Sequence, residues 1–380
     1  MKKGWSEKAF TDFATLERRE ASIDDDGEYP EVGVRCFGKG LFHKLARTGI
    51  EVGDKKLFRL KEGDFILQVT FAWEGAVAIV GKEDESLFGS VRVLTFELDT
   101  AMCDTRFLLW YFRTAAGVAQ LARISPGSAG RNKVLAIGRL GEMKIPLPSL
   151  AEQQRIVSHL DAIETRLTRV QKRREEQGVE LLAAFRSAFH KLEAKADWLE
   201  MGKVAPLVRR EVDIEPEGLY PELGIRSFGR GTFHKPAVLG MATTKRLFEI
   251  HTGDLVFSNV FAWEGAIAVA QPEDHGRLGS HRFISCVCDS DRVLADYLQF
   301  YFLTPGGLEK IGKASPGGAG RNRTLGIEKL AEIQVPVVPL AIQLEFKKLL
   351  NLQTRIRTEA LQASQRSAAL APSLLDRIFK

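Results

Sequence analysis

The sequence predicts an α/β protein with two similar domains joined by two long antiparallel coiled-coil helices, a pseudo-twofold internal repeat. Two duplicated segments indicate the repeat. FAWEGAVAIV around Trp73 returns as FAWEGAIAVA around Trp263, and SPGSAGRN at 125–132 returns as SPGGAGRN at 315–322, both 190 positions later. A third observation, an apolar heptad pattern between the two copies, predicts the coiled coil. Two copies are too few for a solenoid, so we expect two globular domains.

Composition is typical of a globular protein with ordinary packed cores. The chain has 380 residues, of which 44% are hydrophobic, enough for two or three domains. It lacks a long apolar run and its start, MKKGWSEKAF, lacks the apolar segment of a secretory signal, so we expect a cytoplasmic protein. The formal charge of +5 permits a polyanionic partner without requiring one. The four cysteines lack the spacing of a zinc site and are expected to be reduced thiols.

Each repeat has the same order of predicted elements. A basic, Gly-rich opening reads YPEVGVRCFGKGLFHK at 29–44 and YPELGIRSFGRGTFHK at 220–235. Alternating and β-branched residues then predict strands in a body that is interrupted at Trp-Glu-Gly. Mixed aromatic and aliphatic residues at 103–123 and 295–313 predict packed helices. The Gly-rich SPG loop, a short strand and a long helix complete each repeat.

The first long helix is the most clearly predicted element. Ser149 is expected to cap it, with Glu152 three positions later as in a capping box. The apolar heptad positions are Ile156, Leu160, Ile163, Leu167 and Val170, then Leu182, Phe185, Phe189 and Leu192 after a polar stretch. The C-terminal helix repeats the pattern more weakly, with one seam row at Leu349, Ile356, Ala363 and Leu370 and the other at Gln353, Ala360, Ser367 and Leu374. We expect the two helices to pair and to hold the domains at a fixed distance.

The segment IPLPSLAEQQRIVSHLDAIETRL, between two domains and matched by a second helix, resembles the DNA specificity subunits of type I restriction-modification systems. The resemblance covers essentially the whole chain. It implies a non-catalytic subunit with two target recognition domains, each reading one half of a bipartite double-stranded DNA site. It also implies two modification subunits with adenine methyltransferase activity docked on the helices, and restriction subunits that can join them. The residues expected to dock partners are Glu152, Gln153, Gln154 and Arg155.

The resemblance gives four expected parts. They are target recognition domain 1 at 1–148, a central spacer helix at 149–196, target recognition domain 2 at 197–339 and a C-terminal spacer helix at 340–380. The second helix departs from the family pattern, because Ile342 stands where the first helix has Glu152. Whether two partner copies dock equivalently therefore stays open.

The residues themselves favour DNA as the ligand. Cations among glycines can neutralise phosphates at close approach, which supplies affinity without sequence preference. Arg can make two hydrogen bonds to guanine and Asn two to adenine, and Glu can accept from cytosine N4. The expected DNA-binding residues of the first domain are Arg35, Lys39, His43, Lys44, Trp73, Glu74, Arg131, Asn132 and Lys133. Those of the second are Arg226, Arg230, His234, Lys235, Trp263, Glu264, Arg321, Asn322 and Arg323.

Structural alternatives exist for each of these sites. The Arg-Asn loops are so alike that scaffold or phosphate contact is favoured over base discrimination, which should rest on residues that differ between the halves. Core packing is favoured for Trp73 and Trp263. Glu74 and Glu264 fit a turn carboxylate equally well. His43 and His234 stand at matched positions of the two repeats. Neither has a His or Cys neighbour at ligand spacing, so no metal site is predicted.

No catalytic motif and no cofactor-binding loop is recognisable, so neither a catalytic residue nor a cofactor is predicted. Two other classes of function remain open. One is an enzyme that uses Glu74 and Glu264 as a pair of carboxylates. The other is a coiled-coil adaptor that binds proteins without DNA sequence specificity. A steep loss of DNA affinity with salt would separate DNA recognition from the adaptor.

Overall fold

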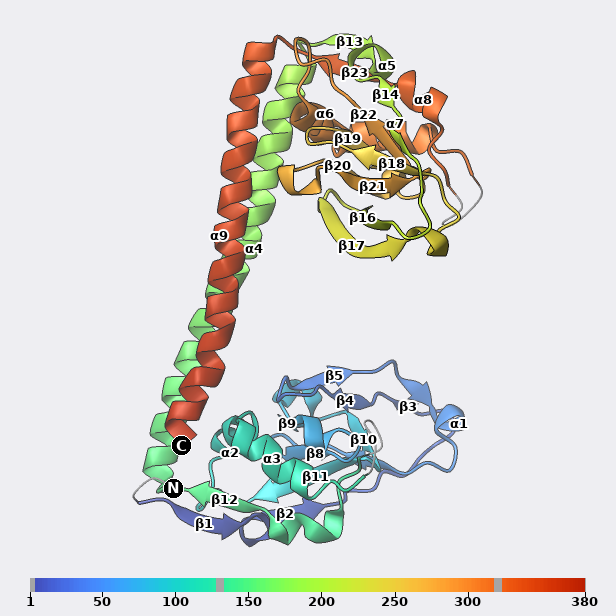
Figure 1. Ribbon diagram of the computed structural model, residues 1–380. Helices are drawn as coiled ribbons and strands as arrows, with labels where there is room; N and C mark the ends of the chain where they lie inside the picture. The colour runs from blue at the N-terminus through green and yellow to red at the C-terminus, as the bar shows by residue number, and fades with distance from the viewer. Residues whose placement is uncertain (1–3, 128–132, 318–322, 380) are drawn as a thin grey trace. The chain divides into compact units, whose positions relative to one another are not determined.

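The computed structural model describes residues 4–127, 133–317 and 323–379 (Figure 1). The chain divides into two compact units, Met1–Arg173 with Leu361–Lys380, and Arg174–Ala360. Each unit contains a strand-rich α/β domain and part of both long helices, α4 (Leu150–Glu193) and α9 (Leu340–Phe379). Across the described residues, every helix is too short or too polar to cross a membrane.

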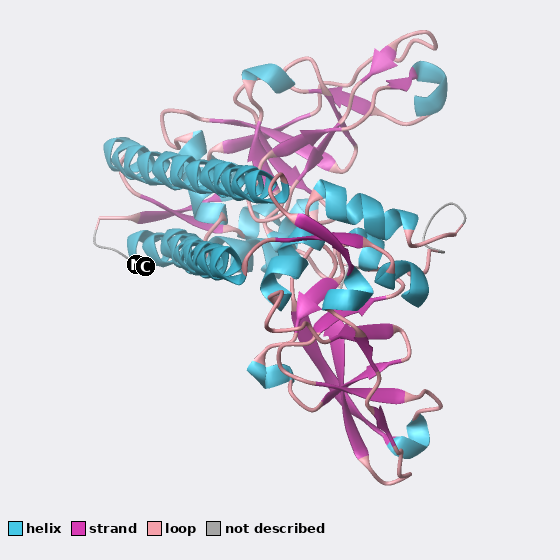
Figure 2. Ribbon diagram, turned by 90° about the horizontal axis from the view of Figure 1, so that it is seen from above, coloured by secondary structure: helices cyan, strands magenta, loops and turns pink. Residues whose placement is uncertain are grey.

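The first unit is built on an antiparallel sheet of strand order β2-β11-β8-β9, whose strands are labelled in Figure 1. Figure 2 shows the strands in magenta and the helices in cyan. Strand β8 is buried on both faces: Phe65 and Leu67 join the core beside α2 and α3, whereas Ile66 joins a second core beneath β4. The continuous apolar run of β8 thus serves two layers. The elements of this unit are β1 (Ser6–Ala9), β2 (Ala14–Glu17), β3 (Glu28–Tyr29), β4 (Val32–Val34), β5 (Leu41–His43), β6 (Arg47–Thr48), α1 (Gly49–Val52), β7 (Leu57–Arg59), β8 (Phe65–Gln68), β9 (Val77–Ile79), β10 (Phe88–Ser90), β11 (Val93–Leu98), α2 (Thr105–Phe112), α3 (Ala115–Arg123) and β12 (Lys144–Leu147).

The second unit repeats this plan with a sheet of order β14-β22-β19-β20 and a five-stranded sheet, β15-β18-β21-β16-β17. Leu255 and Phe257 of β19 face one core, and Val256 faces another. The repeat is therefore structural as well as sequential. Its elements are β13 (Asp197–Glu200), α5 (Met201–Val204), β14 (Leu207–Val208), β15 (Glu211–Val212), β16 (Leu219–Ile225), β17 (Thr232–Leu239), β18 (Leu247–Ile250), β19 (Leu255–Ser258), β20 (Ile267–Val269), β21 (Arg277–Ser280), β22 (Phe283–Cys286), α6 (Ala295–Phe302), α7 (Pro305–Lys313), α8 (Ile327–Ala331) and β23 (Gln334–Val337).

The two long helices pair in antiparallel fashion, as predicted. In the first unit, the start of α4 and the end of α9 share one core, to which Leu160 and Leu375 belong. In the second unit, the end of α4 meets the start of α9, where the rings of Phe189 and Phe346 lie 5.3 Å apart. The predicted cap is present, because the Glu152 amide donates to Ser149 Oγ at 3.4 Å.

The predicted seam of α9 is half wrong. In one predicted row, Leu349, Ile356 and Leu370 are 45%, 43% and 51% exposed, whereas Ala363 is half-buried, so most of this row faces outward. Buried Phe346, packed against Phe189, sets the rotation of the helix, and the residues at steps of three and four from it lie inward. Half-buried positions at these steps are Leu350, Gln353, Ala360, Ser364, Ser367 and Leu374, whereas Arg357 is exposed.

A buried glutamine joins each helix to its own domain. Gln153, predicted to dock a partner, is 0% exposed. Its Oε1 accepts from the Asp104 amide at 2.8 Å, and its Nε2 donates to the carbonyls of Met102 and Pro148 at 2.9 and 3.0 Å. Because this side chain is committed within the chain, we leave Gln153 out of any docking surface.

The second helix has the same joint. Gln343 is also fully buried, and its Oε1 accepts from the Leu294 amide at 2.9 Å. Its Nε2 donates to the carbonyls of Arg292 and Val338 at 2.9 and 2.7 Å. The two glutamines stand 190 positions apart, so the duplication preserved the joint exactly where the domain meets its helix.

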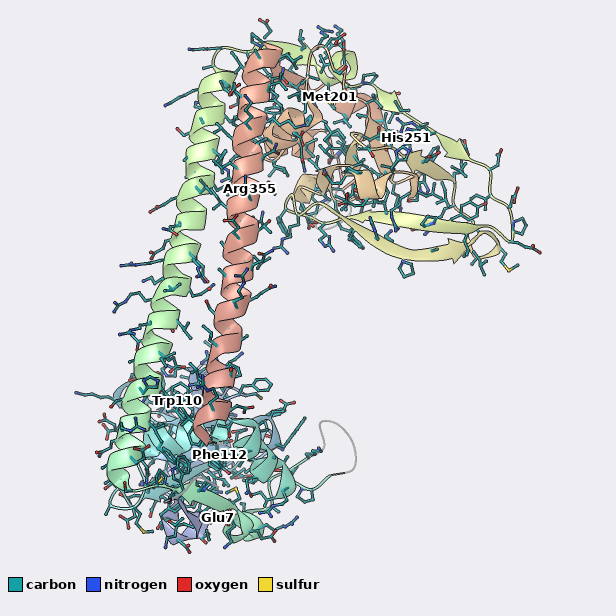
Figure 3. All side chains as sticks on the ribbon, turned by 60° about the vertical axis from the view of Figure 1, so that its left-hand side comes forward. Glu7, Trp110, Phe112, Met201, His251 and Arg355 are labelled. Atoms are coloured by element: carbon teal, nitrogen blue, oxygen red, sulfur yellow. The ribbon has the colours of Figure 1, made fainter. Side chains whose placement is uncertain are left out.

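Side chains of α2 add polar contacts to the joint of the first unit. Trp110, which lies beside the two helices (Figure 3), donates from Nε1 to Asp161 Oδ1 at 2.9 Å. Arg106 pairs with the same carboxylate at 2.7 Å, and Arg113 pairs with Glu164 at 2.7 Å. The pairs are partly exposed, so each adds at most about 1 kcal/mol, and the buried amide network is the larger contribution.

Replacing Gln153 by Ala should therefore destabilise the first unit by about 2–4 kcal/mol, because three backbone groups lose a buried partner. Gln154→Ala is the matched control. Gln154 is the next residue along the helix and its side chain is exposed, so its replacement should lower the unfolding free energy by less than about 0.5 kcal/mol. Urea unfolding of the two variants measures the difference. Equal midpoints would show that the amide network does not hold the joint.

Candidate DNA interface

The Gly-rich segment forms a tight loop between β4 and β5. The Arg35 amide donates to the Gly40 carbonyl at 2.9 Å and closes the loop. Inside it, Phe37 has φ of 61°, a left-handed conformation that costs a non-glycine residue of order 1 kcal/mol. Phe228 has φ of 62° at the matched position of the second domain. The same strain is therefore built into both repeats, where strained residues commonly serve a function.

The loop of the first domain is held on the Trp-Glu-Gly turn. The amides of Phe37 and Gly38 donate to the carbonyls of Glu74 and Gly75 at 3.0 and 2.8 Å. The Cys36 thiol donates to Glu74 Oε2 at 3.1 Å. Two segments that the sequence singled out separately thus form one structure.

The second domain repeats these contacts. The amides of Phe228 and Gly229 donate to the carbonyls of Glu264 and Gly265, both at 2.8 Å. The Ser227 hydroxyl takes the place of the thiol and donates to Glu264 Oε2 at 3.1 Å. In both domains the turn glutamate already holds the loop. Glu74 and Glu264 thus act as turn carboxylates, the structural alternative to base reading, and the groups that donate to them are side chains of the loop.

The described end of the SPG loop reaches the same turn. Lys133 Nζ lies 5.2 Å from the ring centroid of Trp73, and Arg323 Cζ lies 5.4 Å from that of Trp263, within range of a cation–π contact. Both indoles are half-buried. The predicted pairs Arg131 and Asn132, and Arg321 and Asn322, lie outside the described residues.

Two further DNA-contact candidates are the strained phenylalanines, Phe37 and Phe228, which were not among the residues predicted from the sequence. Phe37 is 61% exposed and Phe228 is 72% exposed. Lys39 Nζ and Arg230 Cζ lie 5.7 and 5.6 Å from their ring centroids. An exposed ring with an adjacent cation is a combination that stacks on bases or wedges between base steps. The signal was available in the repeated Phe-Gly-Lys/Arg-Gly, which we had interpreted through its cations alone.

The other cations of the loop are partly committed within the chain. Arg35 donates to the Leu41 carbonyl and lies 5.4 Å from the Phe42 ring, and Arg226 repeats this with Thr232 and Phe233. Their guanidinium groups remain at the surface. They are thus positioned against their own strands and still reachable by a phosphate.

The last two predicted positions of each loop face buried carboxylates. His43 Nε2 lies 2.7 Å from Asp84 Oδ1, and Lys44 Nζ lies 3.7 Å from Glu31. His234 Nε2 lies 2.9 Å from Asp274, and Lys235 lies 3.3 Å from Glu222. These side chains are the polar partners of buried carboxylates, so their replacement would destabilise the domain as well as weaken an anion contact. Lys39 and Arg230 are therefore the cleaner phosphate-binding candidates.

The second unit has a cleft of about 360 Å³ that begins at both ends of its loop, at Ile225 and Phe233. Lys235, Lys245 and Arg282 give its lining a positive character. A ligand with a negative backbone is the kind that this cleft favours.

The cysteines offer no nucleophile. Burial raises the pKa of Cys36 to about 11, with its hydrogen bond to Glu74 as the next cause. Burial likewise raises the pKa of Cys103, Cys286 and Cys288 to about 12. All four groups are therefore protonated thiols near neutral pH.

Of the residues expected to dock a partner, three lie at the surface of the first turns of α4. Arg155 pairs with Glu152 at 2.7 Å and its side chain is largely exposed. Gln154 is exposed beside them. This surface is polar, in contrast to the matched Ile342 and Leu344 of α9.

Comparisons with known proteins agree with this architecture. Residues 2–180 match the family model of the type I restriction modification DNA specificity domain, whereas no curated protein sequence matches the chain. A chain from a structural study of complex assembly and conformational transition of the type I R-M system has a TM-score of 0.72 at 18% identity, over 100% of this chain and 98% of that one. The HsdS subunit from Thermoanaerobacter tengcongensis has a TM-score of 0.58 at 17% identity, over 100% and 97%.

At these identities the likeness shows a shared fold, two strand-rich domains with long helices, over the full length of the chain. The family model matches less than half of the chain, so what it shows is that the first repeat is similar to a type I restriction modification DNA specificity domain.

Proposed function

We propose that the chain is a non-catalytic subunit that reads a bipartite double-stranded DNA site, one half-site for each domain. The observation that carries the proposal is the duplicated cluster of loop, turn and cation, which exposes Phe37 with Lys39 and Phe228 with Arg230. Duplex DNA offers repeated phosphates and stacked bases, so two copies of one interface can bind two places on it. In this proposal the recognition domains are 1–148 and 197–339, and the spacer helices are 149–196 and 340–380.

We further propose that two adenine methyltransferase subunits dock on the helices, and that restriction subunits join them. In this proposal the docked subunits carry the methyl-transfer chemistry. The surface of Glu152, Gln154 and Arg155 supports docking on α4. Its counterpart on α9 is apolar, so the two copies would meet different side chains.

Base discrimination is expected at cleft positions that differ between the domains. Ser258 and His281 line the cleft of the second unit, and Gln68 and Val91 stand 190 positions before them. Glutamine can make two hydrogen bonds to adenine, whereas serine bonds to several bases. The cations, in contrast, are matched in both domains, as expected for contacts to phosphates that carry no sequence information.

The decisive measurement is modified-base sequencing of the host genome with the gene intact and deleted. We expect adenine methylation at one bipartite motif to disappear on deletion and to return on complementation. Survival of every methylated motif in a strain that expresses the protein would overturn the proposal and favour a protein-binding adaptor.

The helices are expected to set the spacing of the two half-sites. Removing one heptad from the middle of both α4 and α9 shortens each by about 10 Å, which corresponds to about three base pairs. The methylated motif should then keep both half-sites with a shorter spacer between them. Removing a heptad from one helix alone is the control, and it should abolish methylation because the paired seams fall out of register. An unchanged spacer in the double deletion would contradict the ruler.

The strained phenylalanines are expected to matter for DNA binding and not for folding. Replacing both Phe37 and Phe228 by Gly removes the strain at positive φ, so unfolding free energy should stay within about 1 kcal/mol. Affinity for a duplex that contains the motif should fall at least about tenfold, because two stacking rings are lost. Leu45→Ala, at an exposed residue outside the cluster, is the control for surface apolar area. Full affinity in the double Gly variant would exclude stacking by these rings.

A further inference from the structure

Outside the DNA interface, the edge of the second unit brings two histidines and a glutamate together. Glu249 lies on β18, and His251 is the first residue after the end of that strand. Residues two positions apart in an extended chain project to the same face, so Glu249 and His251 share one face. Strand β21 pairs with β18 in antiparallel register, with Ile250 opposite Arg277. The chain just before β21 therefore passes His251, and this places His275 beside it.

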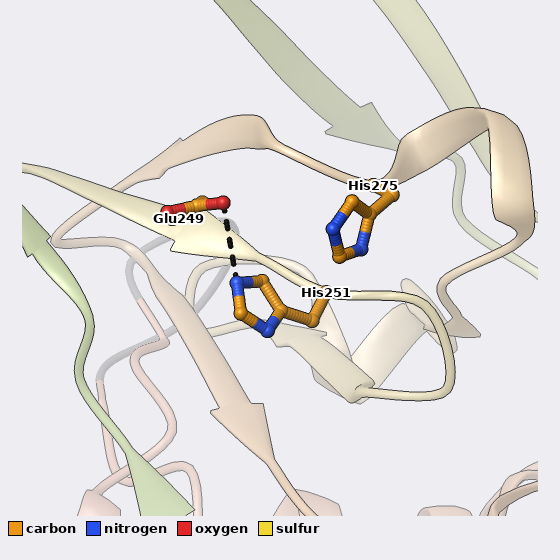
Figure 4. A group of neighbouring side chains, drawn as sticks. All are labelled: Glu249, His251 and His275. Carbon is orange, nitrogen blue, oxygen red and sulfur yellow. Dashed lines mark hydrogen bonds and ion pairs between the residues drawn. The ribbon is translucent and has the colours of Figure 1, made fainter.

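The three side chains point toward one another (Figure 4). His251 Nε2 lies 3.2 Å from Glu249 Oε1, and the two imidazole rings have centroids 4.8 Å apart. One ligand atom of each residue lies within 4.8 Å of the others. Among the described residues, this is the one group of three His, Cys, Asp or Glu side chains with such spacing.

The backbone that carries the histidines is fixed by a buried ion pair. The His251 amide donates to Asp254 Oδ2 at 3.0 Å, and Asp254 is buried and paired with Arg210 at 2.6 Å. The Gly276 amide donates to the Ile250 carbonyl at 3.0 Å and ties the His275 turn to the same strand. The three side chains thus stand on a rigid edge, as a preorganised site requires.

We propose that Glu249, His251 and His275 bind one divalent transition-metal ion of the zinc class. Two imidazoles and a carboxylate are ligands that zinc and its neighbours prefer over calcium or magnesium. Three protein ligands leave one tetrahedral position open to water or to an outside oxygen. The ion would clip the end of β18 to the turn before β21. Nothing in DNA recognition by the loop cluster requires it.

Binding requires a small rearrangement. Ligand atoms around a tetrahedral ion at about 2.0–2.1 Å lie closer together than the widest separation here. The Thr252 amide donates to His275 Nδ1 at 3.3 Å. If Nδ1 binds the ion, its lone pair is no longer free to accept this hydrogen bond, and if Nε2 binds the ion, Nδ1 carries the proton and cannot accept it either. The hydrogen bond between His251 Nε2 and Glu249 Oε1 is also given up when these atoms bind the ion. Two weak bonds are a minor loss beside three metal–ligand bonds.

The first domain supplies a natural control for this site. Its matched turn has the same support, because the Lys61 amide donates to Asp64 Oδ2 at 3.1 Å and Asp64 pairs with Arg19. The positions of the three ligands, however, hold Arg59, Lys61 and Glu85. The turn at the second position is shared, but the third position differs in backbone as well as in side chain, because Glu85 has ψ of −29° and His275 has ψ of 132°. The proposal therefore requires one ion per chain, in the second domain alone.

The test is calorimetric titration of zinc chloride into the full-length, tag-free protein after treatment with a chelator. We expect saturable binding of one ion per chain and an unfolding midpoint raised by about 5 °C or more at a hundredfold excess over Kd. His251→Lys installs the residue that the matched turn holds in the first domain, and His275→Ala removes an exposed imidazole without supplying another ligand, so both variants should fold. Each should weaken zinc binding more than about tenfold. His159→Ala, on the exposed side of α4, is the control for unspecific histidine binding.

Either of two results would overturn the proposal: no saturable binding to the wild-type chain, or binding that survives both ligand substitutions. The methylation pattern of the His251→Lys strain separates this outcome from DNA recognition, because it should remain unchanged.

Discussion

The arrangement of each domain depends on one constraint, the burial of its central strand on both faces. In β8, Phe65 and Leu67 need a hydrophobic cover on one side and Ile66 needs one on the other. The first cover is made by α2, α3 and the start of α4, and the second by β4 with the strands around it. The Gly-rich loop after β4 returns to the helical layer, because Gly38 lies against the Arg113 side chain at the end of α2 and Gly75 lies against Val118 of α3. Since Arg113 also pairs with Glu164 of α4, the loop is connected to the spacer helix through α2.

Rigidity at the attachment comes from polar groups in an apolar setting. A buried glutamine with three backbone partners is strongly directional, because misplacing it leaves several groups unpaired. Gln153 and Gln343 thereby fix the orientation of helix and domain more tightly than apolar packing alone. Because α9 is already anchored at its start, its packing against α4 can be weak further along. The half-buried residues there are small or polar, as at Gln353, Ala360 and Ser367.

The sequence predicted what depends on repetition and periodicity. The duplication, the α/β class, the antiparallel pair of helices and the cap at Ser149 are all present in the structure. The burial of particular residues was harder to predict from the sequence. Glutamine is usually exposed, so Gln153 was expected at the surface, and only the tertiary contacts with Met102 and Asp104 reveal its role. The rotation of α9 was likewise decided by the contact of Phe346 with Phe189, which lies far away in sequence.

The candidate interface was predictable in its parts but not in their arrangement. Loop, turn and SPG segment were each visible as repeats, yet the bonds that join them, such as Phe37 amide to Glu74 carbonyl, belong to the tertiary structure. The comparison of the two domains explains why the repeats stayed so alike there. Support residues such as Glu74 and Glu264 hold the same loop and admit little change, whereas side chains that only face outward are free to differ. After duplication, such outward-facing positions can acquire a new ligand without disturbing the fold. His281 in the cleft and the histidines beside Glu249 both occupy such positions.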